Sequence, residues 1–227
     1  MSNVKITFIS DTHRKHKYLD NDLPGGDILI HSGDISSLGK EDEVKKFFNW
    51  FEATPYTHKV LISGNHDFCF EERYGWLEEI LENLITNKSS VIYLQDSSVE
   101  LFGLKLYGSP WQPRFHDWAF NADRGEDIKK HWDKIPINTD ILITHGPPFG
   151  ILDQARGLPL GCEELYKKVI EVKPIIHCFG HIHPGYGDRT FNDTLFINAA
   201  MLDDSYEYSH KPITIDLNTI TKDITYL

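Results

Sequence analysis

The sequence predicts an α/β fold with a mixed sheet, and two patterns lead to that prediction. Five short apolar runs rich in β-branched residues recur along the chain, and each is typical of a strand buried on both faces. They cover residues 5–10, 27–32, 59–63, 140–144 and 174–179. Amphipathic stretches alternate with these runs, as helices alternate with strands in α/β proteins.

Four stretches between the runs have the apolar spacing of helices. They span residues 41–51, 73–85, 127–132 and 163–171. The first carries Val44, Phe47, Phe48 and Phe51 at intervals that place them on one helix face. The second carries its apolar residues in the same way, and the last two are shorter.

Two regions are typical of antiparallel strands instead. Residues 91–109 look like strands joined by tight turns, with Gly103 at one turn. The segments 196–201, 211–217 and 219–227 alternate apolar and polar residues, as the strands of a meander do. The sheet is therefore expected to be mixed, and two sheets packed face to face with helices outside would fit the same pattern.

The overall composition indicates one domain over residues 1–227. Of these residues, 40% are hydrophobic and 25% are charged, which is ordinary for a globular protein. The three cysteines, Cys69, Cys162 and Cys178, have no metal or disulfide spacing, which fits a reducing compartment. The start of the chain lacks a signal-peptide pattern, and no apolar run has the ~18 residues of a membrane span. We expect a cytoplasmic protein that does not enter a membrane.

The charge balance restricts the class of ligand. The chain carries 34 acidic and 23 basic residues and a net charge of −11. Such a chain repels nucleic-acid polymers at long range, and no cluster of lysine and arginine offsets that repulsion. We therefore expect a small-molecule ligand, while the oligomeric state has no signal in the sequence.

All five strand-length runs end in a cluster of polar residues. The clusters are Asp11-Thr12-His13, Gly33-Asp34, Gly64-Asn65-His66-Asp67, His145-Gly146 and Gly180-His181-Ile182-His183. In α/β sheets, ligands bind outside the carboxyl ends of the strands. Five neighbouring strands would therefore bring all these groups to one rim.

Apart from Asp67, the clusters supply two carboxylates, one amide oxygen and five imidazoles. Oxygen and imidazole donors together suit manganese, iron, zinc or cobalt, and the lack of cysteine argues against a structural zinc site. One ion uses about four to six donors, so seven or eight indicate two ions that share a bridging carboxylate. Two ions ~3.5–4 Å apart are the geometry that hydrolyses phosphate esters.

Each histidine taken alone would more often be a core or surface residue, and only their joint position at strand ends favours the metal-site interpretation. The remaining seven histidines are interpreted as structural: His16, His31, His58, His116, His131, His177 and His210. The aromatic segment 111–121 leaves two interpretations open, a packed surface loop or a surface that stacks on a nucleobase. Arg114, Arg124 and Arg156 are candidates for contact with a phosphate or a ribose.

Together the motifs D-x-H, G-D, G-N-H-D, H-G and G-H-x-H resemble the signature of the calcineurin-like metallophosphoesterases, in family order over residues 11–183. The stretches LYGSPWQPRF, FNADRG, DILITHGPPFG and GHIHPGYG are similar to the metallophosphoesterase-domain-containing (MPPED) branch. The resemblance implies an αββα sandwich of two mixed sheets flanked by helices.

The resemblance also implies a role for each motif residue. The first ion would be bound by Asp11, His13, Asp34 and His183, with Asp34 as the bridge. The second ion would be completed by Asn65, His145 and His181. His66 would be no ligand: together with Asn65 it would contact the phosphate, and it would protonate the leaving oxygen while Asp67 orients its ring.

The implied function is that of a dinuclear metal-dependent phosphodiesterase, with manganese as the expected ion and iron, zinc or cobalt as alternatives. A hydroxide held between the two ions would attack small phosphodiesters, above all 2′,3′- or 3′,5′-cyclic nucleotides. Two other functions stay open: a phosphomonoesterase acting on phosphoprotein or a nucleotide, and a nucleotide-binding or scaffold module with little activity. The complete set of ligands argues against the last.

Overall fold

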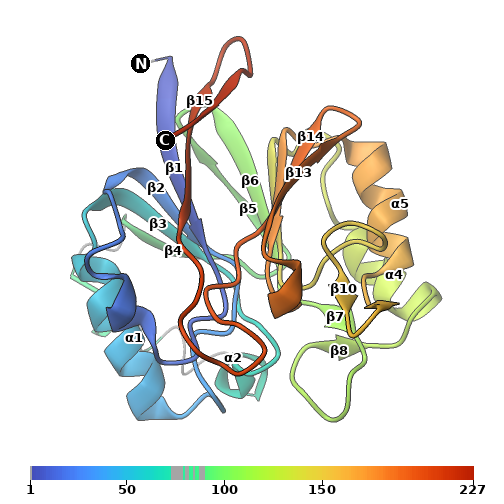
Figure 1. Ribbon diagram of the computed structural model, residues 1–227, viewed down its shortest axis with the longest axis horizontal. Helices are drawn as coiled ribbons and strands as arrows, with labels where there is room; N and C mark the ends of the chain where they lie inside the picture. Colours follow the sequence, from blue (N-terminus) through green and yellow to red (C-terminus); the bar gives the residue numbers. More distant parts are fainter. Residues whose placement is uncertain (1, 73–78, 80–81, 84, 87–89) are drawn as a thin grey trace.

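Two six-stranded sheets pack face to face in the computed structural model, which describes residues 2–72, 79, 82–83, 85–86 and 90–227. Helices α1 (Glu41–Ala53) and α2 (Phe68–Glu72) lie on one side of the sandwich, and α4 (Glu126–Trp132) and α5 (Glu163–Val172) lie on the other (Figure 1). The predicted αββα sandwich of two mixed sheets is therefore confirmed.

The first sheet is parallel at its centre and antiparallel at one edge. Its strand order is β16 (Ile224–Tyr226), β15 (Ile213–Asn218), β1 (Asn3–Ile9), β2 (Gly26–His31), β3 (Tyr56–Leu61) and β4 (Val91–Tyr93). β1 to β4 run parallel, and β15 pairs antiparallel with both β1 and β16. The short helix η1 (His16–Leu19) lies in the connection between β1 and β2.

The second sheet has four parallel strands between two antiparallel edge strands. Its order is β13 (Gly187–Phe191), β14 (Thr194–Asn198), β12 (Ile176–Phe179), β9 (Ile141–Thr144), β6 (Leu104–Ser109) and β5 (Ser97–Leu101). Two small ladders lie outside it, β7 (Gln112–Pro113) with β8 (Asn121–Ala122), and β10 (Gln154–Ala155) with β11 (Leu158–Pro159). The short helix η2 (His183–Gly185) follows β12.

Alternate side chains of the central strands explain why these runs are apolar on both faces. In β2, Ile28 and Ile30 pack into the core between the sheets, whereas Leu29 packs with Phe47 and Phe51 of α1. Successive side chains of a strand point to opposite faces, so a strand covered on both sides needs an unbroken apolar run. A third cluster packs α4 and α5 against the outer face of the second sheet.

Most of the predicted elements are present. The five apolar runs form β1, β2, β3, β9 and β12, and three predicted helices form α1, α4 and α5. Gly103 lies in the two-residue turn between β5 and β6, where Phe102 and Gly103 have φ values of 53° and 75°. Positive φ at both turn residues is typical of a type I′ hairpin. The helix predicted over 73–85 lies largely outside the described residues.

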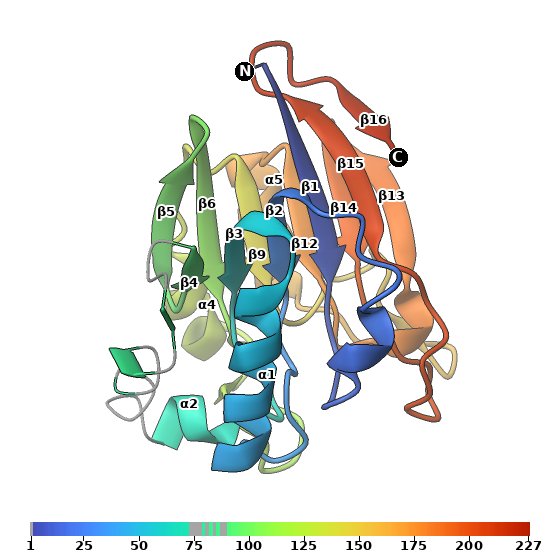
Figure 2. The ribbon, with the colours of Figure 1, turned by 90° about the vertical axis from the view of Figure 1, so that its left-hand side faces the viewer.

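Two expectations about the sheets are wrong. The C-terminal segments do not form one meander, because β14 belongs to the second sheet whereas β15 and β16 belong to the first. The five apolar runs are not neighbours in one sheet either, since β1, β2 and β3 lie in the first sheet and β9 and β12 in the second. Their carboxyl ends nevertheless lie at the same end of the sandwich (Figure 2).

No helix among the described residues has the length and apolar character needed to cross a bilayer.

Candidate metal centre

The loops that follow β1, β2, β3, β9 and β12 are tied to one another by hydrogen bonds. The backbone N–H of Asp11 donates to the carbonyl of Gly33 at 2.9 Å, and the N–H of His13 donates to the carbonyl of Asp34 at 3.0 Å. The N–H of His181 donates to the Asp11 carboxylate at 2.9 Å. These bonds join the two sheets where their strands end, so polar groups from both sheets meet at one place.

Several residues at this place have a left-handed backbone. The φ values are 52° at Asp11, 37° at His13, 59° at Asp34 and 65° at His181. Each such residue costs about 1–3 kcal/mol, and strain of this kind gathers at functional sites. Close approach adds a further constraint, because a Cβ at Gly180 would lie 1.9 Å from Oδ2 of Asp11. The loops are therefore held in conformations that only a specific local sequence allows.

Three overlapping groups of side chains have the spacing of metal ligands, with all ligand atoms of each group within 4.8 Å of one another. The groups are Asp11 with His13 and His183, His13 with Asp34 and His66, and Asp34 with His145 and His181. Oδ2 of Asp34 lies 3.6 Å from Nε2 of His13 and 3.3 Å from Nε2 of His145. One carboxylate oxygen therefore lies between imidazoles of two groups.

Four of the imidazoles are oriented in the same way. Nδ1 of His13, His66, His145 and His183 lies 2.9–3.2 Å from the backbone carbonyls of Ser36, Ser37, Ser32 and Asp203, respectively. A carbonyl only accepts hydrogen bonds, so each Nδ1 carries a proton and each Nε2 is the ring nitrogen left to face the site. Metal-binding histidines are held by the same arrangement, in which the second ring nitrogen donates to a carbonyl.

The site fits a divalent ion on the evidence of its own polar atoms. Nε2 of His13 is buried without a hydrogen-bond partner among the described residues, although Asp11 and Asp34 oxygens lie 4.0 and 3.6 Å away. Buried polar atoms are rarely left unpaired without a reason. Oδ1 of Asn65 lies 2.9 Å from Nε2 of His145, so two more donors converge beside Asp34. Oxygen and imidazole donors of this kind match the preference of manganese, iron, cobalt and zinc.

The charges of the site favour a cation. Burial alone would raise the pKa of Asp11 and of Asp34. His183 beside Asp11 and His145 beside Asp34 outweigh this effect, so both pKa values lie below their usual range. Burial alone would likewise lower the pKa of His145 and of His183, but the same carboxylates raise each to about 9. Two buried carboxylates thus hold positive charge close to them, which is what a metal site requires.

A cavity of about 360 Å³ opens onto these residues. Its floor includes His13, Asp34, Asn65, His181 and His183. Its walls come from the β7–β8 segment and from the loop that ends near Leu160, and they include Phe115 and Trp118. An organic group next to the polar floor would therefore contact an aromatic wall.

Comparison with known proteins identifies the family. The sequence model described as Calcineurin-like phosphoesterase matches residues 4–185. The chain belongs to the calcineurin-like phosphoesterases. Members of this family use divalent metal ions, and this calcineurin-like phosphoesterase is accordingly a hydrolase of phosphate esters whose described residues include three candidate ligand groups.

Individual relatives agree with this assignment. This phosphoesterase is 40% identical over 235 residues to human Metallophosphoesterase domain-containing protein 1, across 95% of this chain and 72% of the relative. It is 26% identical to a probable glycerophosphodiester phosphodiesterase of Arcobacter nitrofigilis, across 78% of this chain and 71% of the relative. The crystal structure of a Thermus thermophilus protein, TT1561, has the same fold, with a TM-score of 0.65, 14% identity and coverage of 99% and 98% of the two chains.

Asp67 contacts other groups of this phosphoesterase than predicted. Its buried carboxylate accepts hydrogen bonds from the backbone N–H groups of Asp34, Ser36 and Gly64 at 2.9–3.0 Å and from the Ser36 hydroxyl at 2.7 Å. The His66 ring is held by the Ser37 carbonyl instead. Among the described residues, no hydrogen bond joins Asp67 to the His66 ring, because the loop after β2 takes up the hydrogen-bonding capacity of this carboxylate. An effect of Asp67 on the orientation of the ring stays a prediction.

His66 is half-buried and faces the cavity. Its ring packs on Trp118, with centroids 4.1 Å apart and the ring planes tilted by 34°, and forms an edge contact with His13 at 4.6 Å. His66 also belongs to one of the three ligand groups, so its position in this phosphoesterase suits either a ligand or a group that contacts substrate. Trp118 belongs to the aromatic segment 111–121 and lines the cavity, as the stacking interpretation of that segment requires.

Two of the three candidate arginines, Arg114 and Arg124, line the cavity. Arg124 lines the cavity, but its guanidinium donates to the carbonyls of Gly161 and Leu160 and to Glu163. Arg114 pairs with Asp123 at 2.6 Å, and Arg156 is not among the lining residues. Sequence reasoning also missed Tyr206, whose ring lies 5.0 Å from His13 and 5.2 Å from His183. No motif surrounds Tyr206, so only the fold reveals its place.

Proposed function

We propose that this calcineurin-like phosphoesterase holds two divalent ions and hydrolyses small phosphodiesters. The position of Asp34 supports this proposal most directly, because one of its oxygens lies within 3.6 Å of imidazoles from both sides of the site. One ion would be held by Asp11, His13, Asp34 and His183. The other would be held by Asp34, Asn65, His145 and His181.

Bound ions of this kind activate a water molecule for attack on phosphorus and neutralise charge on the phosphate oxygens. We expect both ions to be manganese, because carboxylate, amide and imidazole donors all suit manganese.

The residues of the chain supply the remaining chemistry. Asn65 and His66 face the cavity and would contact the phosphate. Nδ1 of His66 donates to the Ser37 carbonyl, so Nε2 is the atom free to carry a proton toward the substrate. As the bond from phosphorus to the leaving oxygen breaks, His66 gives that oxygen its proton and an alcohol is released. The oxygen of water stays on phosphorus, and the product is a phosphomonoester.

The walls of the cavity favour a diester with an organic group next to the metal centre. Trp118 and Phe115 offer aromatic faces, and stacking on a nucleobase contributes about 1–3 kcal/mol per base. A 2′,3′- or 3′,5′-cyclic nucleotide carries such a base beside a small phosphodiester. The relative from Arcobacter nitrofigilis is also described as a phosphodiesterase, which agrees with this class of reaction.

The test compares two aryl substrates on protein first stripped with a chelator and then loaded with manganese. We expect two bound ions per chain, and a kcat/KM for bis(p-nitrophenyl) phosphate at least about tenfold above that for p-nitrophenyl phosphate. A panel of cyclic nucleotides then identifies the preferred ring. Faster turnover of the monoester would make the protein a phosphomonoesterase instead. Absence of turnover with metal bound would point to a binding or scaffold module.

A further inference from the structure

A second cavity, of about 530 Å³, also reaches residues of the metal centre. It shares His13, His66 and Tyr206 with the first cavity, and the residues that it does not share include Arg14, Lys15 and Glu207. Of the shared residues, His66 is the proposed general acid and His13 a candidate metal ligand. A phosphate held at the metal centre would therefore adjoin both cavities.

The two cavities differ in chemistry. The first has the aromatic wall described above. In the second, Lys15 donates to Glu207 at 2.7 Å and to the Tyr206 carbonyl at 2.6 Å, so its charge is neutralised by a close partner. Once Lys15 is paired with Glu207, the remaining guanidinium or ammonium charge in the second cavity is that of Arg14.

Arg14 is available to bind an anion. Its side chain is 60% exposed, and Nε of Arg14 lies 3.6 Å from Glu43, beyond a good hydrogen bond. The Glu43 carboxylate accepts from the backbone N–H groups of Ser37 and Leu38 through Oε2, while its Oε1 is the oxygen that faces Arg14. Arg14 therefore has a weak, solvent-exposed ion pair that an anion can replace. The backbone N–H of Arg14 donates to the Ile35 carbonyl at 3.1 Å, which fixes the residue next to His13 while leaving the guanidinium free to move.

A third cavity continues the same surface away from the metal centre. It is lined by Arg14, Lys15, Lys17 and Lys46, with Glu43 as the acidic residue among its lining. Lys15 and Lys46 pair with Glu207 and Asp42, so Arg14 and Lys17 carry the remaining positive charge of this surface. An excess of positive charge at a cleft concentrates anions there.

We infer that Arg14 forms a subsite for an anionic group on the second arm of a linear phosphodiester, whose aromatic arm occupies the first cavity. The inference rests on the proposed phosphodiesterase activity and names the substrate class for it. A cyclic nucleotide has both ester oxygens in one ring and so has no second arm to reach the second cavity. A linear diester with a phosphate or carboxylate on its second arm uses both cavities.

The test uses two linear diesters with the same p-nitrophenyl leaving group, one with an ethyl second arm and one with a 2-phosphonoethyl second arm. Wild-type protein loaded with manganese should have a kcat/KM about tenfold higher for the phosphonoethyl probe, as one charge-assisted contact provides. Arg14→Gln should bring the two values within about twofold while it leaves kcat/KM for the ethyl probe and the metal content unchanged.

Arg189→Gln is the matched control, because it removes the same charge from the exposed edge strand β13. This variant should keep the wild-type preference. Equal kcat/KM for the two probes in wild type would overturn the subsite while leaving the phosphodiesterase intact, and so would a preference that survives in Arg14→Gln.

If neither probe is hydrolysed, the proposed function fails and the same probes serve as ligands in calorimetry. Tighter binding of the phosphonoethyl probe to wild type, but not to Arg14→Gln, would then still establish the subsite. Equal binding would refute it.

Discussion

At the scale of single residues, His66 is held by three different kinds of contact. A carbonyl binds Nδ1, the Trp118 ring covers one face, and His13 meets the ring from the side. Each contact removes rotational freedom from a group that needs a defined direction to transfer a proton. The ring is thus oriented before substrate arrives.

His66→Ala should keep both ions. Its kcat/KM should fall most for substrates with poor leaving groups. Loss of a general acid lowers kcat/KM by about 10²–10⁴-fold for an alkyl leaving oxygen, but little for p-nitrophenolate, which needs no proton. The measurement is kcat/KM over a series of leaving groups, with metal content by elemental analysis. His116→Ala, in an exposed histidine of the β7–β8 segment, is the control. Loss of bound metal in His66→Ala would show that His66 is a ligand.

At the scale of elements, the loop after β2 organises the site more than any other segment. Its Ser32, Ser36 and Ser37 carbonyls hold the rings of His145, His13 and His66, and it carries Asp34 itself. The Asp67 carboxylate accepts hydrogen bonds from three backbone N–H groups of this loop and from that of Gly64 in the loop after β3. One buried carboxylate therefore sets the position of several candidate ligands.

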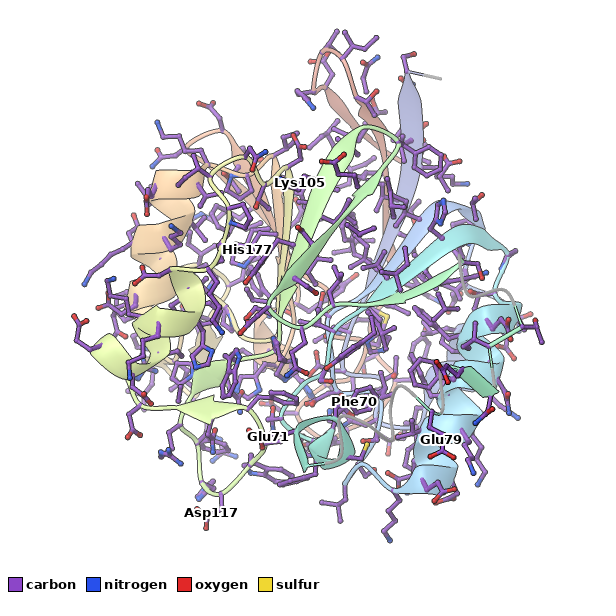
Figure 3. All side chains as sticks on the ribbon, turned by 180° about the vertical axis from the view of Figure 1, so that it is seen from behind. Phe70, Glu71, Glu79, Lys105, Asp117 and His177 are labelled. Atoms are coloured by element: carbon purple, nitrogen blue, oxygen red, sulfur yellow. The ribbon has the colours of Figure 1, made fainter. Side chains whose placement is uncertain are left out.

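Asp67→Ala should lower the free energy of unfolding by about 3 kcal/mol or more, because several buried donors lose their acceptor at once. It should also weaken metal binding, since Asp34 and three imidazole rings lose their support. Urea unfolding and metal titration measure the two effects. Asp117→Ala is the control, as Asp117 is exposed in the loop between β7 and β8 (Figure 3). Reduced turnover with unchanged stability and metal affinity would mean that Asp67 acts on His66 after all.

At the scale of the whole molecule, buried neutral histidines couple stability to pH. His177 of β12 is fully buried, its Nε2 lies 2.8 Å from the Thr144 hydroxyl, and burial lowers its pKa to about 3 (Figure 3). Burial likewise lowers the pKa of His31 to about 3. The unfolded chain binds protons at these groups below about pH 6.5, whereas the folded chain does not. Their contribution to stability is therefore complete above that pH and is lost as the pH falls toward 3.

For His177 alone, this difference corresponds to about 2 kcal/mol of unfolding free energy lost between pH 7 and pH 5. His177→Gln keeps a polar group beside Thr144 but cannot titrate. Between pH 7 and pH 5, the unfolding free energy of this variant should therefore fall by about 2 kcal/mol less than that of wild type. Chemical denaturation of both proteins in the presence of a chelator, at several pH values, measures the difference. Parallel curves for the two proteins would show that His177 does not carry this dependence.

The set of elements and the chemistry at their ends could be predicted from local sequence. The runs that form β1, β2, β3, β9 and β12 are apolar throughout because both of their faces are covered, and burial of that kind is visible in a single segment. The polar residues that follow them are equally local, so the candidate ligands could be named before any distance was known.

Which strands share a sheet, and which groups hold the ligands, became known only from the fold. β14 and β15 have similar patterns yet lie in different sheets, because pairing depends on partners far away in the sequence. The carbonyl that holds His66 belongs to Ser37, 29 residues earlier, and Tyr206 reaches the site from a loop without any motif. Contacts of this kind are made by backbone groups that every residue carries, so the identity of the residue gives no sign of them.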